Sequence, residues 1–158
     1  MNYPEDQANH TDEKTVDEIL ARLFITTFKI EEKAIAEESK HMLSISELHV
    51  LREIGEGKPR TMTQVARGLK ISVGALTTAM NKLEAKGFVK RERDAKDRRI
   101  VKLHLTDAGC EEFRIHEEFH RNMVNAAIGT LTPEEKAVLL KSLSKLDDWF
   151  IAEWSRVK

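Results

Sequence analysis

The chain lacks the features of an exported, membrane-bound or disulfide-stabilised protein. Cys110 is the single cysteine among 158 residues, so no internal disulfide can form and the fold does not depend on oxidation. No apolar run approaches the length that crosses a bilayer, and the first residues, MNYPEDQANHTDEK, are polar and acidic rather than those of a secretory signal. We therefore expect a cytoplasmic protein with no membrane partner.

Motifs of catalysis are missing as well. The sequence contains no glycine-rich nucleotide loop, no GxSxG nucleophile elbow and no HExxH zinc motif. Its carboxylates and histidines fall on charged helix faces, without a spacing that pairs an acid with a base. We expect no enzyme activity, no catalytic residue and no required cofactor.

Charge is distributed unevenly along the chain, although the formal total is only −1. Residues 58–102 hold thirteen Lys or Arg against four Asp or Glu, a local charge of +9. The remainder holds 13 basic against 23 acidic residues, a charge of −10. Lys and Arg neutralise phosphates, so a basic middle within an acidic frame indicates a nucleic-acid site.

Hydrophobic periodicity predicts a mainly α-helical chain with a small β-hairpin wing. A first helix is expected from about Val16 to Glu38, with an apolar face wide enough to meet a second subunit. Ser44 and Glu47 form a capping box for the next helix, which ends at Gly55.

Two short helices follow and form a predicted helix-turn-helix. Thr61 and Gln64 repeat the capping pattern for the first, and Ser72 caps the second, which ends at Gly87. The second helix repeats its apolar residues on one side, so that side is expected to be buried. These residues are Val73, Leu76, Met80 and Leu83.

Beyond Gly87 the apolar period changes from 3.6 to 2. Residues 88–93 and 100–105 are expected to be two strands joined by a polar connector, which together form a charged hairpin. Thr106 then caps a long helix to about Ile128, and Thr132 with Pro133 starts a last helix with a long apolar seam.

Three segments resemble the MarR family of regulators, and the resemblance covers about residues 12–156. They are residues 43–51 (LSISELHVL), residues 83–91 (LEAKGFVKR) and residues 97–109 (DRRIVKLHLTDAG). The resemblance implies one chain of 1–158 with a winged helix-turn-helix in 44–106. It also implies homodimerisation through helices in 12–40 and 107–156, and repression from a palindromic double-stranded DNA operator.

The exposed side of the second short helix is expected to read the major groove, because small residues near its start allow close approach to base edges. In the family pattern, Asp97 braces Arg99, which enters the minor groove. The major-groove set is Ser72, Gly74, Ala75, Thr77, Thr78, Asn81 and Lys82, and the wing set is Arg91, Arg93, Lys96, Asp97, Arg98 and Arg99.

Within the family, the chain resembles the fatty-acid-biosynthesis repressors of Gram-positive bacteria (FabT type). The resemblance rests on Glu47-Leu48-His49, on residues 74–87 and 97–106, and on residues 116–124 (HEEFHRNMV). It implies a long-chain acyl group on acyl carrier protein as corepressor, held in an apolar tunnel between the first and fifth helices. Candidate tunnel residues are Phe24, Phe28, Phe113 and Met123.

Other interpretations of the effector stay open. His116 and His120 are four apart on one helical face, so with His41 and the Glu31/Glu32 pair they could bind zinc. Redox sensing through Cys110, or a small aromatic effector, are further alternatives. The alternative of another class is a winged-helix protein-interaction module, which has no need for the arginines of the wing.

Overall fold

The computed structural model describes the backbone of residues 4–38 and 43–157, and the side chains of residues 12–35 and 43–157. The chain divides into two compact units, Met1–Glu117 and Glu118–Lys158. Among the described residues, no helix is both long and apolar enough to cross a membrane. The expected fold class, mainly helical with a small β-wing, is confirmed.

Three short helices in the first unit form the helix-turn-helix region: α2 (Ile45–Ile54), α3 (Met62–Gly68) and α4 (Val73–Ala85). The predicted capping boxes are present at the starts of α2 and α3, where the side chains of Ser44 and Thr61 accept from the amides of Glu47 and Gln64. Ser72 caps α4 in the same way, accepting from the Ala75 amide. Local capping therefore sets all three helix starts.

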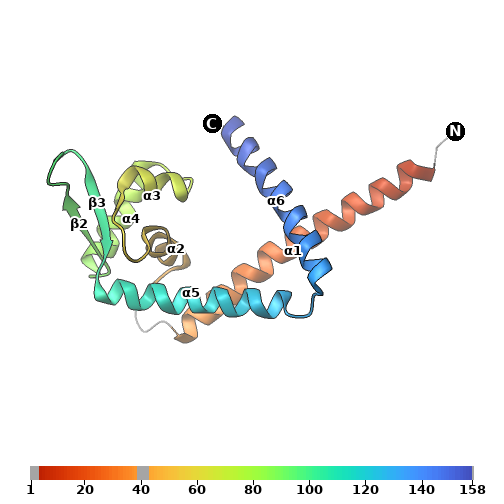
Figure 1. The fold of residues 1–158 in the computed structure, drawn as a ribbon, viewed down its shortest axis with the longest axis horizontal. Coiled ribbons are helices and arrows are strands. Elements are labelled where there is room, and N and C mark those ends of the chain that lie inside the picture. Colours follow the sequence, from red (N-terminus) through yellow and green to blue (C-terminus); the bar gives the residue numbers. More distant parts are fainter. Residues whose placement is uncertain (1–3, 39–42, 158) are drawn as a thin grey trace. The chain divides into compact units, whose positions relative to one another are not determined.

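An antiparallel sheet of three strands completes this region, in the order β1-β3-β2. Strands β2 (Val89–Arg93) and β3 (Val101–Leu105) form the predicted hairpin, each one residue shorter than expected at its start. They lie beside α3 and α4 (Figure 1). Strand β1 (Arg60–Thr61) was not predicted, because a strand of two residues has no alternation to detect.

The core of the first unit lies between α2, α3, α4 and the sheet. Leu51, Leu76, Met80, Leu83 and Leu103 are all fully buried there. This fixes which side of α4 faces inward, as the apolar spacing predicted. The prediction was wrong for Val73, which is 46% exposed because it stands in the first turn, before the helix meets the core.

The start of α5 (Asp107–Ile128) packs tightly against the start of the wing. The Thr106 hydroxyl donates to the Gly87 carbonyl at 2.7 Å and accepts from the Gly109 amide at 3.1 Å. A Cβ on Gly109 would lie 2.0 Å from the Phe88 carbonyl oxygen, so only glycine fits here. This contact joins the helix to the wing.

Helix α1 (Pro4–Glu38) begins well before the expected start at Val16. Its first turns hold polar residues with adequate helix propensity and no apolar stripe, so a periodicity argument cannot detect them. Further along, a run of large apolar side chains is 40–64% exposed on this helix. The run comprises Val16, Ile19, Leu23, Phe24, Ile25, Phe28 and Ile30.

The second unit contains the last turns of α5 and the whole of α6 (Pro133–Arg156). As predicted, Thr132 caps α6 and Pro133 occupies its first turn; the structure adds a capping box between Thr132 and Glu135. Among its described residues, α6 has none that is buried by its own chain. Its exposed apolar seam comprises Val138, Leu140, Leu143, Leu146, Trp149, Phe150, Ile151 and Trp154.

Candidate nucleic-acid interface

The solvent-facing side of α4 gathers the residues predicted to read the major groove. Because Leu76, Met80 and Leu83 face the core, the opposite side is left exposed. A Cβ added to Gly74 would meet only the Ser72 hydroxyl, at 3.8 Å, so packing does not require glycine there. The exposed set is Ser72, Gly74, Ala75, Thr77, Thr78, Asn81 and Lys82.

Hydroxyl groups on this side of α4 also bond to their own helix. Ser72 Oγ accepts from the Ala75 amide at 3.1 Å, while the Thr77 hydroxyl donates to the Val73 carbonyl at 2.8 Å. The Thr78 hydroxyl donates to Gly74 at 3.4 Å. With their protons used inside the helix, Thr77 and Thr78 offer DNA a lone pair and a methyl group, which suits contact with a thymine methyl.

Arg91 binds the recognition helix rather than extending into solvent with the other wing cations. One terminal nitrogen of its guanidinium donates to Asn81 Oδ1 at 2.8 Å and to the Thr77 carbonyl at 3.3 Å. The other lies 3.3 Å from the Glu84 carboxylate. Arg91 therefore fixes β2 against α4, and Asn81 keeps mainly its amide nitrogen for a contact with a base or phosphate.

Asp97 and Arg99 meet in the wing, as the family pattern implied. Arg99 Nε and a terminal nitrogen each donate to one Asp97 oxygen at 3.0 Å, and the Arg99 amide donates to the same carboxylate at 3.0 Å. These bonds from Arg99 lower the pKa of Asp97. The fork is thus braced while the side chain stays 91% exposed, an arrangement suited to insertion into a narrow groove.

Asp94 organises the tip of the wing, a role that the sequence reasoning missed. Its side chain accepts from the backbone amides of Lys96 at 2.8 Å and Asp97 at 3.0 Å, and it pairs with Lys102. The bond from Lys102, with the two amides, lowers the pKa of Asp94 to about 2. The signal was present in the sequence, because an Asp at the first position of a polar turn commonly bonds the amides that follow it.

The remaining basic residues of the wing lie on its surface. Arg93, Lys96 and Arg98 are all exposed, as is Lys82 on α4. Their charges are free to approach phosphates, which gives affinity without sequence information.

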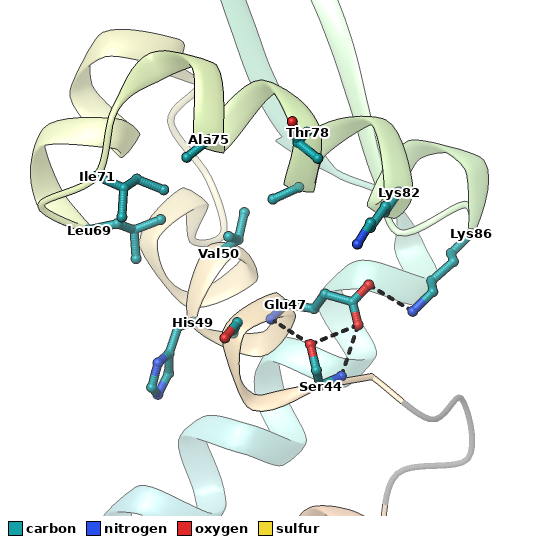
Figure 2. Close-up of a pocket in the computed structure, with 12 residues that line it drawn as sticks. Ser44, Glu47, His49, Val50, Leu69, Ile71, Ala75, Thr78, Lys82 and Lys86 are labelled. Carbon is teal, nitrogen blue, oxygen red and sulfur yellow. Dashed lines mark hydrogen bonds and ion pairs between the residues drawn. The ribbon is translucent and has the colours of Figure 1, made fainter.

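A pocket of about 610 Å³ opens between α2 and α4, beside the exposed side of the recognition helix (Figure 2). Ala75, Thr78 and Lys82 line it from α4, and His49 and Val50 from α2. Figure 2 shows the polar contacts at its lower end: the Glu47 carboxylate accepts from Lys86 Nζ at 2.7 Å and from the Ser44 amide at 2.9 Å.

Glu47 thereby ties the start of α2 to the residue that caps the end of α4. Burial by itself raises the pKa of this carboxyl, but the bonds from Lys86 and Ser44 lower the pKa by more, so it lies below its ordinary value. Lys86, which the sequence offered only as part of a family motif, is thus a positioning residue for the recognition helix.

The predicted metal residues are only partly brought together. His116 and Glu31 are buried side by side in the first unit, with His49, which was not predicted, next to them. Glu32 is exposed, His41 lies outside the described residues, and His120 belongs to the second unit.

The structure gives little support to the acyl tunnel or to redox sensing through Cys110. Phe24 and Phe28 are exposed on α1, at 64% and 55%, whereas Phe113 packs against the core. Met123 belongs to the second unit, so the acyl tunnel stays a prediction. Burial, together with a bond to Glu56, raises the pKa of Cys110, which disfavours the thiolate that redox sensing needs.

Comparison with known proteins places these features in one family. Residues 43–100, which include α4 and most of the wing, match the model of the MarR family. The HTH-type transcriptional regulator YkoM of Bacillus subtilis is 33% identical over 127 residues, covering 80% of this chain and 82% of YkoM. YpoP, another HTH-type regulator of the same organism, is 31% identical and covers 66% of this chain and 74% of its own length.

Solved structures agree with the fold. The crystal structure of Streptococcus pneumoniae FabT in complex with DNA superposes with a TM-score of 0.84 at 35% identity, covering 89% of this chain and 98% of that one. The transcriptional regulator SlyA superposes with a TM-score of 0.76 at 20% identity, covering 90% and 99%, and shows likeness of fold alone.

The bond between Glu47 and Lys86 predicts a pH-dependent contribution to stability. A carboxyl whose pKa is lowered on folding stabilises the fold above its ordinary pKa, 4.5, and this contribution is lost as the pH falls through the lowered value. We expect Glu47→Gln to reduce the free energy of unfolding by about 1–2 kcal/mol at pH 7. Urea unfolding at pH 7 and pH 3 measures this.

Glu32→Gln is the control, since Glu32 is exposed on α1. It should leave the free energy of unfolding unchanged at both pH values. If Glu47→Gln lowered the free energy of unfolding equally at pH 3 and pH 7, the charge of the carboxylate would not be what holds α2 against α4.

Proposed function

The chain belongs to the MarR family of transcriptional regulators, and from that membership we propose that it is a homodimeric repressor of a palindromic operator. Members of this family regulate transcription by binding DNA and are not enzymes. One observation carries the proposal. The same packed unit presents the exposed side of α4, which is made of small residues, and the exposed Arg99 of the wing, which Asp97 holds in place.

Each of these elements suits a different part of the duplex. From Gly74 to Thr78 the exposed side of α4 carries only small residues, so its backbone can come close to base edges in the major groove. The exposed fork of Arg99 suits the electronegative minor groove of A/T-rich DNA. Arg93, Lys96 and Arg98 supply phosphate contacts around it.

Dimerisation is supported by the apolar side chains that each unit leaves exposed. The apolar run on α1 and the apolar seam on α6 are too extensive for an ordinary solvent-facing helix. One recognition helix alone makes few base contacts, whereas a twofold dimer presents two, ~34 Å apart, to successive major grooves. We therefore propose that α1 and α6 carry the subunit interface.

For the effector, we propose a long-chain acyl group on acyl carrier protein, acting as corepressor at fatty-acid-synthesis genes. The support is the extended FabT-type resemblance in α4, the wing and α5, together with the likeness to the DNA-bound FabT structure. A ligand shifts DNA affinity only if it binds the DNA-competent arrangement of the dimer differently from the other.

Arg99 gives the most direct test of the wing. Arg99→Ala is expected to weaken operator binding by about 5- to 150-fold, the equivalent of losing one specific arginine contact. Asp97→Asn should cause a smaller loss, because it removes the brace and keeps the cation. Fluorescence anisotropy measures Kd, and sedimentation checks that the dimer is intact. Arg121→Ala, which removes an exposed arginine of α5, is the control; unchanged binding in Arg99→Ala would exclude the minor-groove role.

Gly74 provides a test in which stability and DNA binding move in opposite directions. The methyl added by Gly74→Ala meets only the Ser72 hydroxyl, at an ordinary contact distance of 3.8 Å, and a helical glycine is removed, so the free energy of unfolding should rise by up to about 1 kcal/mol. The added methyl stands where α4 approaches the bases, and we expect operator binding to weaken tenfold or more. Chemical denaturation and anisotropy measure the two effects; full affinity in this variant would place the DNA elsewhere.

The effector proposal is tested with a palindromic duplex taken from upstream of fatty-acid-synthesis genes. Acyl carrier protein loaded with a long acyl chain should tighten anisotropy-measured binding severalfold, and the unloaded carrier protein should not. A duplex that binds equally well with and without the loaded carrier would contradict the lipid effector and leave the DNA-binding function standing.

A further inference from the structure

Three ligating side chains from three helices converge in the first unit. Glu31 comes from α1, His49 from α2 and His116 from α5. Glu31 Oε1 lies 2.7 Å from His116 Nε2 and 3.2 Å from His49 Nε2. The two imidazole rings are 5.7 Å apart between centroids and tilted by 58°. We refer to these three residues as the Glu31 cluster.

The Glu31 cluster is buried on one side and open on the other. The side chains of Glu31 and His116 are only 6% and 2% exposed, whereas that of His49 is 43% exposed. Burying a carboxylate is costly unless a cation neutralises it. The buried Glu31 and His116 give an ion a site of low dielectric constant, and the half-exposed His49 gives it a path from solvent.

We propose that the Glu31 cluster binds a divalent transition-metal ion, with Zn²⁺ as the expected occupant. Two imidazole nitrogens and one carboxylate oxygen are ligands that zinc prefers, whereas Mg²⁺ and Ca²⁺ favour oxygen alone. The three ligand atoms lie within 4.8 Å of one another. Bonds of ~2.0–2.1 Å in tetrahedral geometry separate ligands by about 3.4 Å, which is close to the 2.7 Å and 3.2 Å that separate Glu31 from the two imidazole nitrogens.

Three protein ligands leave one coordination position for water or a further side chain. His120 follows His116 by four residues on α5, the spacing at which two histidines share a helix face. Its participation was predicted from this spacing, but His120 belongs to the second unit, and the proposal rests on the three residues of the first unit alone. His41, the other predicted ligand, is replaced in the proposal by His49.

The position of the cluster gives the ion a mechanical role. It joins α1, part of the proposed dimer interface, to α2, the first helix of the helix-turn-helix region. His49 also lines the pocket beside α4, so fixing its ring fixes one wall of that pocket. Metal binding therefore locks the DNA-binding region against α1.

The experiment uses the full chain without a histidine tag, stripped with EDTA and titrated with Zn²⁺ against a chromophoric chelator. We expect one ion per chain and a higher unfolding temperature in its presence. Loss of an outer-shell partner alone typically weakens metal binding 10- to 100-fold. Replacing a direct ligand, in Glu31→Gln, His49→Gln or His116→Gln, should therefore weaken it at least about 100-fold.

Matched controls come from the same chain. Glu32→Gln changes the neighbouring exposed acid, and His104→Gln changes a wing histidine that pairs with Glu92 at 3.3 Å. Both should keep the affinity of the unaltered chain.

Co²⁺ provides a readout that does not depend on any variant folding. In the unaltered chain, its visible absorption should show the intense bands of a tetrahedral nitrogen and oxygen site. Failure to bind one Zn²⁺ per chain, or equal affinity in the cluster variants and the controls, would reduce the cluster to a hydrogen-bonded Glu–His group. No DNA enters the measurement, so its failure leaves the proposed repressor function untouched.

Discussion

The buried side of α4 is the contact on which the rest of the DNA interface depends. Leu76, Met80 and Leu83 share one core with Leu103 of β3, so the recognition helix and the wing belong to the same packed body. The rotation of α4 about its axis, and its offset from Arg99, are therefore set by close packing that tolerates little adjustment. The charged residues act on DNA from positions that the apolar core determines.

Polar contacts refine this placement. Arg91 holds β2 against α4. Glu47 holds α2 against the end of α4, because it accepts a hydrogen bond from Lys86, the residue that caps that helix. Both use charged groups in an otherwise basic region to hold elements rather than to bind phosphate. The Glu31 cluster extends the same principle to α1, because its three side chains connect α1 with α2 and α5. An effector that alters these contacts can alter how the two recognition helices of a dimer are spaced.

Sequence reasoning succeeded where the cause is local and failed where it is not. The capping boxes, the buried stripe of α4 and the bracing of Arg99 by Asp97 involve residues only a few positions apart. Ligand type had grouped Glu31 with His116, which is 85 residues away, but nothing in the sequence pointed to His49, the third member of the cluster. Arg91 was predicted to be one of the DNA-contacting residues of the wing, and only the fold shows that it binds α4.

The central claim, that two copies of this interface read a twofold-symmetric duplex, is most directly tested without guessing an operator. Selection from a pool of random duplexes by the purified chain, followed by sequencing, reports what it prefers. The account predicts an inverted repeat whose half-site centres are about one helical turn apart, with A/T-rich positions where the wings reach the minor groove. Enrichment of an unrepeated motif, or no enrichment above the input pool, would contradict it.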